Sequence, residues 1–222
     1  YMWGEYGFTS YPISSNAQRP KAIKYLLEEA YKYQSPDVVV IELRMFTYED
    51  EEMKNDEAHI REVTDNMRYS LHYFDIIKYH SNWGMFFEKE ELQKIAYNKA
   101  DLHKGFEHPE KIMYHDEEID RYIPTEDRIA IPVEQEEVLR DLISYLKEKE
   151  QEVIFVVAPI KYDSDFFAKV NYMRDIVEAE GFQYINMLEE IELDFATDLL
   201  DGSHTNILGA RKCSQVLGAI LS

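Results

Sequence analysis

The sequence is poor in the residues that mark several common protein classes. Among 222 residues there is one cysteine, Cys213, which excludes an internal disulfide and a disulfide-stabilised scaffold. It lies in an apolar helical pattern, which predicts a small core residue. Glycine and proline are scarce, with 8 and 7 residues, and the sequence has no glycine-rich phosphate loop.

Positive charge is also scarce. There are 24 Lys and Arg residues against 44 Asp and Glu residues, which gives a formal net charge of −20. Binding to nucleic acid or to an anionic membrane surface needs a basic face. We therefore expect neither kind of partner, and we interpret the acidity itself as a solubilising surface.

Long apolar runs are absent as well. The longest, residues 153–160, is far too short to span a bilayer. The chain opens at Tyr1-Met2-Trp3 without the charged region of a signal peptide. An opening residue other than Met suggests a fragment, so a membrane association is expected only through an N-terminal anchor outside this sequence.

No pattern in the sequence indicates a metal or cofactor site. The histidines lack metal-ligand spacing and have no cysteine partners, so we expect neither a metal nor a cofactor. Acidic residues are too abundant for any pair of them to indicate glycosidase chemistry.

Helical and strand patterns alternate along much of the chain. Continuous β-branched apolar runs indicate strands buried on both faces, and apolar stripes at helical spacing indicate helices between them. Such alternation predicts a parallel sheet with helices on both faces. The expected strands are 9–13, 38–43, 153–158 and 182–186, and the expected helices are 21–33, 133–150, 166–180 and a last one ending near 221.

Residues from about 46 to 130 break this alternation. The stretch is charged and aromatic, without the regular apolar runs of the flanking regions. We interpret it as a mostly helical insertion that caps the carboxyl edge of the sheet, within a single domain over residues 1–222. Ligands of open α/β sheets bind at that edge.

The most specific motif is the run Asp201-Gly202-Ser203-His204. An acid and a histidine three residues apart, ahead of an apolar helix, can place a carboxylate against one imidazole nitrogen while the other faces a cleft. Asp201 would then fix the tautomer of His204, which would act as a general base. In the other reading Asp201 only caps a turn and His204 is a surface residue.

These residues, with Asn206 and Gly209-Ala210, resemble the last conserved block of the SGNH/GDSL hydrolases, in which Asp and His complete the catalytic triad. Residues 36–43 resemble the third strand of that family. The resemblance extends to SGNH-like proteins of gut Firmicutes whose insertion carries a Tyr-His-x-x-Trp element, here residues 79–83. It implies an α/β fold of flavodoxin-like, SGNH-hydrolase type: a three-layer α/β/α sandwich with a mainly parallel sheet and a helical insertion.

The chain departs from the family at three places. The block with the nucleophilic serine would precede Tyr1, so the nucleophile is expected outside this chain. Residues 44–47 stand where the family has Gly-x-Asn-Asp, and Ser14 stands near the position of a family glycine. Only Asp201 and His204 carry over, and we expect this fragment to be inactive by itself.

Four other residues are candidates for oxyanion or substrate binding: Ser14, Asn16, Gln18 and Arg44. The amides of Asn16 and Gln18 are possible oxyanion donors in place of the missing Asn, or else form a polar loop before a helix. Ser14 has a backbone N–H for the same role. Arg44 follows a strand and either binds a substrate anion or forms a salt bridge.

The resemblance implies an esterase or acyltransferase with a Ser-His-Asp mechanism. The expected substrate is an O-acyl ester, either a small molecule or a cell-envelope glycan, and the expected location is outside the cytoplasm and associated with the membrane or envelope, with the cytoplasm as the other possibility. The alternative function is that of a catalytically inactive SGNH-like binding or interaction domain.

Overall fold

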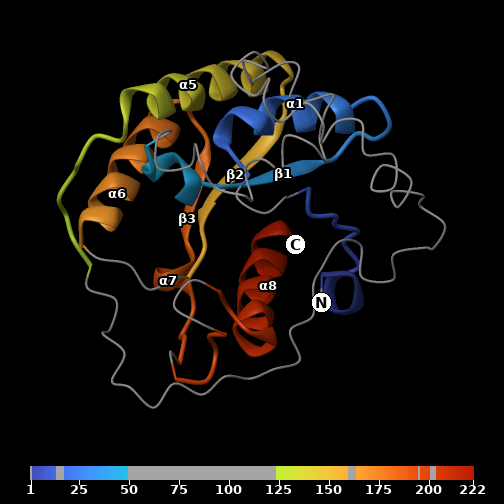
Figure 1. The fold of residues 1–222 in the computed structure, drawn as a ribbon. Helices are drawn as coiled ribbons and strands as arrows, with labels where there is room; N and C mark the ends of the chain where they lie inside the picture. Colours follow the sequence, from blue (N-terminus) through green and yellow to red (C-terminus); the bar gives the residue numbers. More distant parts are fainter. Residues whose placement is uncertain (1, 14–17, 50–123, 160–163, 195, 201–203) are drawn as a thin grey trace, which may run out of the picture.

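The computed structural model describes residues 2–13, 18–49, 124–159, 164–194, 196–200 and 204–222 (Figure 1). Most of the predicted insertion, residues 50–123, lies outside this part of the chain. The described elements are, in order, η1 (Met2–Tyr6), α1 (Pro20–Ala30), β1 (Val38–Glu42), η2 (Arg44–Thr47), α5 (Val133–Glu148), β2 (Glu152–Val157), α6 (Ser164–Ala179), β3 (Gln183–Asn186), α7 (Met187–Glu190) and α8 (Ile207–Leu221).

The three described strands form one parallel sheet in the order β1-β2-β3. Val40 of β1 is in register with Ile154 of β2, and Val156 with Ile185 of β3. The Gln151 side chain donates to the backbone oxygens of Pro36 and Asp37 at 3.2 and 3.1 Å. This amide therefore ties the entrance of β1 to that of β2.

One face of the sheet holds the larger core. Alternate residues of β2 point into it, among them Phe155 and Val157, which are both fully buried. Helices α1, α5 and α6 cover this face (Figure 1). Phe155 meets Phe182 edge to face, with ring centroids 5.6 Å apart. Aromatic pairs of this geometry add specific packing to the burial of apolar area.

The opposite face of the sheet packs against α8. Ile154 and Val156 of β2 and Ile185 of β3 form a smaller cluster there, together with half-buried side chains of α8 that include Cys213. Burial raises the pKa of the Cys213 thiol to about 11, so the group stays neutral. Cys213 is therefore a packing residue of α8, as its sequence pattern predicts.

The predicted alternation of strands and helices is confirmed for 38–222 outside the insertion. Each predicted helix and strand there has a counterpart whose ends differ by a few residues, and the sheet is parallel as expected. The chain is an α/β protein with a small three-stranded parallel sheet in its described part. Two short elements, η2 and α7, were not predicted.

The predicted strand at 9–13 is wrong, because residues 7–13 have no regular structure. Pro12 lacks the N–H that a ladder needs, and Tyr11 and Ile13 are exposed instead of packed. The burial of β1 on both faces is also wrong. Val40 in the middle of the strand is 41% exposed, because β1 is the edge strand of the described sheet.

The two valines Val157 and Val40 provide a matched test of this arrangement. We expect Val157→Ala to lower the free energy of unfolding by about 2 kcal/mol, from lost burial plus the cavity left behind. Val40→Ala removes the same atoms from an exposed position and should cost less than about 0.5 kcal/mol. Urea unfolding followed by circular dichroism measures both values, and equal losses would contradict the described edge.

Candidate functional site

The loop that precedes α8 lies at the carboxyl end of the sheet. Helix α7 follows directly from the last residue of β3, and Figure 1 places α7 and the start of α8 together at this end. Residues 191–206 join α7 to α8. His204, the one described residue of the sequence motif, thus falls at the edge of the sheet where α/β proteins bind ligands.

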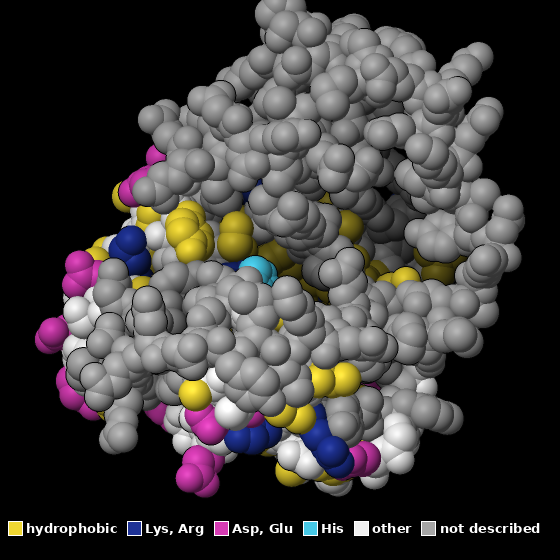
Figure 2. Space-filling view, turned by 60° about the horizontal axis from the view of Figure 1, so that its bottom comes forward, with side chains coloured by type: hydrophobic (Ala, Val, Ile, Leu, Met, Phe, Trp, Pro, Cys, Tyr) yellow, Lys and Arg dark blue, Asp and Glu magenta, His cyan; other side chains and the backbone are white. Residues whose placement is uncertain are grey.

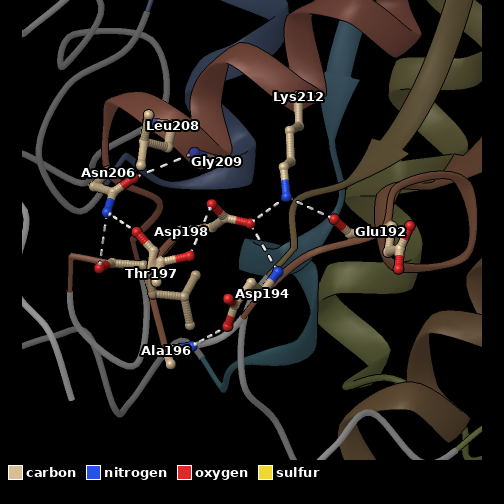
Figure 3. A network of polar contacts seen from close by, with 10 residues as sticks. Glu192, Asp194, Ala196, Thr197, Asp198, Asn206, Leu208, Gly209 and Lys212 are labelled. Carbon is tan, nitrogen blue, oxygen red and sulfur yellow. Dashed lines mark hydrogen bonds and ion pairs between the residues drawn. The ribbon is translucent and has the colours of Figure 1, made fainter. Parts of the chain in front are cut away.

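Asn206 is the N-cap of α8, and its side chain is fully buried. Its Oδ1 accepts hydrogen bonds from the backbone N–H groups of Leu208 and Gly209 at 2.9 and 3.2 Å. Its Nδ2 donates to the backbone oxygens of Thr197 and Leu199 at 2.6 and 3.3 Å (Figure 3). All four hydrogen-bonding positions of this amide are occupied.

Asp198 is the second buried group of this loop, at 2% exposure. Its Oδ2 accepts from Lys212 Nζ at 2.6 Å and from the Asp194 backbone N–H at 2.7 Å. Lys212 Nζ also donates to the Glu192 backbone oxygen at 2.8 Å. The ion pair joins the second turn of α8 to the chain before the motif, and the additional hydrogen bonds satisfy the buried carboxylate.

Gly209 allows these parts to approach closely. It is buried in the first turn of α8, and a Cβ placed there would collide with the backbone oxygen of Asp198 and touch Thr205. That same oxygen accepts the backbone N–H of Asn206 at 2.9 Å. We call Asp198, Asn206, Gly209 and Lys212 the α8 clasp.

His204 is exposed, and its backbone is held by the strand-like pairing next to the clasp. Its carbonyl oxygen accepts the N–H of Leu200 at 2.8 Å, and Leu199 and Thr205 form an isolated antiparallel bridge. A histidine side chain is visible at the surface in Figure 2, with hydrophobic side chains beside it, and His204 is the only histidine among the described residues. Asp201 lies outside that part of the chain.

The other predicted site residues are described only in part. Ser14 and Asn16 lie outside the described residues. Gln18 is half-buried and precedes α1 by two positions, and Arg44 is half-buried as the first residue of η2. Arg44 therefore follows β1 at the carboxyl edge of the sheet, as predicted, but the chain turns there into a short helix.

Glu42, the last residue of β1, is a titratable group that the sequence interpretation missed. It shares the α8 face of the sheet with Val38, since side chains alternate along a strand. Burial raises the pKa of its carboxyl group, although the Arg44 guanidinium and the backbone N–H groups of Arg44 and Ala158 oppose this shift. A carboxyl group with these neighbours holds its proton to higher pH than an exposed one.

Of the α8 clasp, Asn206 and Gly209 entered the sequence-based prediction only as part of the family resemblance, and Asp198 and Lys212 were missed. Asn206 stands directly before an apolar helical run, and this N-cap pattern is visible in the sequence. Asp198 lies 14 positions before Lys212 in a chain full of acids, so no local pattern pairs them. Glu42 ends an apolar run and looks like an ordinary solvated residue.

The described residues contain neither a metal-ligand cluster nor a membrane-spanning helix. No group of three or more His, Cys, Asp or Glu side chains is arranged there to hold a metal ion. No helix in that part of the chain has the length and apolar character needed to cross a membrane.

Comparison with known proteins gives no relative. No family model, curated protein or solved structure matches this chain. The function of the chain is therefore inferred from the residues and the geometry above.

The raised pKa of Glu42 predicts a pH-dependent effect of Glu42→Gln. As pH rises above the ordinary value of 4.5, the unfolded chain ionises at this residue first, so the wild type loses stability until the folded pKa is passed. The variant lacks this loss. We expect the stability of Glu42→Gln relative to wild type to increase between pH 4 and pH 7, measured by urea unfolding.

The matched control for this measurement is Glu152→Gln at the exposed start of β2. It removes the same formal charge from the neighbouring strand and so corrects for the net charge of the chain. If both variants follow the same pH profile, the effect belongs to the overall charge and not to the environment of Glu42.

Proposed function

We propose that this chain is an SGNH-type domain in which His204 is the general base of an ester hydrolase or acyltransferase and Asp201 orients its imidazole. The observation that carries the proposal is the position of His204. It is exposed at the carboxyl edge of a parallel sheet, immediately before α8, on a backbone held by Leu200. A base that must reach a substrate needs both this access and this support.

In the proposed mechanism His204 takes the proton of a serine hydroxyl as the serine attacks an ester carbonyl. It then returns the proton to the leaving alcohol, while Asp201 stabilises the imidazolium formed between these steps. The serine is proposed to come from a strand outside these 222 residues that ends in Gly-x-Ser.

Among the described strands β1 lies at the edge of the sheet, and this position supports the arrangement. Strands of parallel sheets are normally covered on both faces and paired on both sides, whereas Val40 is 41% exposed. The family strand order places the nucleophile strand next to β1. With that strand in place, the architecture would be the complete three-layer α/β/α sandwich of flavodoxin-like type, with the helical insertion over the carboxyl edge.

The proposed substrate is an O-acyl ester on a small molecule or a cell-envelope glycan. Arg44 and Gln18 are the described candidates for binding it, at the end of β1 and the start of α1. A location outside the cytoplasm, with anchoring through an upstream segment, follows from this substrate class and belongs to the same proposal.

One observation favours the alternative of an inactive binding domain. The family places an oxyanion-binding Asn after the third strand, but here that stretch is η2, whose Phe46 and Thr47 side chains are buried. The Thr47 hydroxyl donates to the Arg44 backbone oxygen at 2.8 Å. These two side chains are committed to the fold, so an enzyme would need its oxyanion donors from elsewhere.

Hydrolysis of p-nitrophenyl acetate by the full-length protein distinguishes the two functions. We expect His204→Ala to lower kcat/KM by roughly 10³-fold or more, because a triad without its base loses most of its rate. Gln215→Ala, at an exposed position of the same helix, is the control and should keep the wild-type rate. Equal rates in wild type and His204→Ala would overturn the esterase proposal and favour the binding domain.

A further inference from the structure

We propose that residues 2–8 form a strap that docks on α8 and keeps the C-terminal half of this helix ordered, with Tyr6 as its anchor. Release of the strap leaves the start of α8 in place, where the α8 clasp lies, and loosens the later turns. The proposal follows from contacts between described residues, and it does not depend on the ester chemistry proposed above.

Helix α8 is anchored differently from the other long helices. In α5 and α6 the buried residues are mostly large apolar side chains. In α8 the fully buried residues are two glycines, Gly209 and Gly218, and the apolar side chains over the sheet, such as Val216 and Leu217, are half-buried. The burial of apolar area therefore contributes less to holding α8 than to holding α5 or α6.

Gly218 lies in the interior of α8, where glycine is unfavourable because it gives the unfolded chain more freedom and has no side chain to pack. The structure shows what this glycine provides instead. The ring of Tyr6 lies directly on it, and a Cβ at position 218 would collide with that ring. Gly218 therefore weakens the helix and at the same time leaves the space that the Tyr6 ring fills.

Two polar contacts place the strap along the same side of α8. The Tyr6 hydroxyl donates to the backbone oxygen of Gln215 at 3.2 Å, and Arg211 Nη2 donates to Glu5 Oε1 at 3.3 Å. Positions 211, 215 and 218 are four and three residues apart, so they share one face of the helix. Figure 1 shows η1 beside α8, in agreement with these contacts.

The strap itself has little burial. The rings of Tyr6 and Phe8 are stacked with their centroids 6.3 Å apart, and the Phe8 N–H donates to the Met2 oxygen at 3.2 Å. These three residues are half-buried, and the residues between them whose side chains are described are exposed. A segment with such shallow burial opens at a lower free energy than the core elements do. Docked and released strap are therefore in equilibrium within the folded protein.

Tyr6→Ala removes the anchor of the strap. In hydrogen exchange on the 222-residue chain, we expect the backbone amides of residues 214–218 to exchange about tenfold faster, because the packing of an aromatic ring is lost. The amides of α5 should keep their wild-type rates. The matched control is Tyr11→Ala, which removes a 53% exposed tyrosine outside the strap and should change the exchange of neither helix.

A second substitution tests the contact between the ring and the glycine. Alanine favours a helix interior, so Gly218→Ala in the Tyr6→Ala background should slow exchange at residues 214–218 about fivefold. In the wild-type background the added methyl group collides with the Tyr6 ring and displaces the strap, so the same substitution should bring no such gain. The difference between the two backgrounds measures the coupling of Tyr6 to Gly218.

Wild-type exchange in α8 of Tyr6→Ala would overturn the proposal, as would an equal effect of Gly218→Ala in both backgrounds. Faster exchange that includes α5 would also overturn it, since the loss would then be one of global stability. The strap docks on its own chain, so a dependence of the effect on protein concentration would assign the docking to a second copy instead. Should Tyr6→Ala not fold, Tyr6→Leu removes the ring with a smaller loss of apolar area and is judged by the same exchange rates.

Discussion

Strand β2 is the only described strand with a hydrogen-bonded neighbour on each side, and the described elements take their places from it. Residues 153–157 are all buried, so the strand contributes to the cores on both faces of the sheet. A five-residue stretch without a polar side chain has no stable place except inside such a sheet. The two flanking strands then fix the carboxyl edge at which η2, α7 and the start of α8 lie.

The parts of the fold that the sequence predicts are those whose signal is local. The apolar run of β2 and the helical stripes of α5 and α6 are strong patterns within a few turns of chain. The segment 9–13 has β-propensity, but it pairs with no strand in the described part of the chain and is not a strand itself. The exposure of Val40 likewise depends on what lies beside β1, which no property of β1 itself reveals.

The candidate site likewise has a part that local sequence predicts and a part that it does not. The spacing of Asp201 and His204 is visible in the sequence, and it is the basis of the proposed acid–histidine pair. The sequence does not reveal the contacts that hold the loop around His204. These contacts join Asn206 to Thr197 and Asp198 to Lys212, which are not neighbours in the chain. In a chain with 44 acidic residues, Asp198 is distinguished as a member of a buried ion pair only by the packing around it.

Glu42 and His204, two titratable groups at this edge of the sheet, differ in their exposure to solvent. Glu42 is half-buried, and this burial is what raises the pKa of its carboxyl group. His204 is exposed, and its backbone is held by the hydrogen bond from Leu200 and by the bridge between Leu199 and Thr205. A buried polar network suits the holding of a backbone better than apolar packing, because hydrogen bonds restrict direction as well as distance. Burying the polar side chains of Asp198 and Asn206 costs free energy of desolvation. What this burial provides is a loop of defined conformation, and not added stability alone.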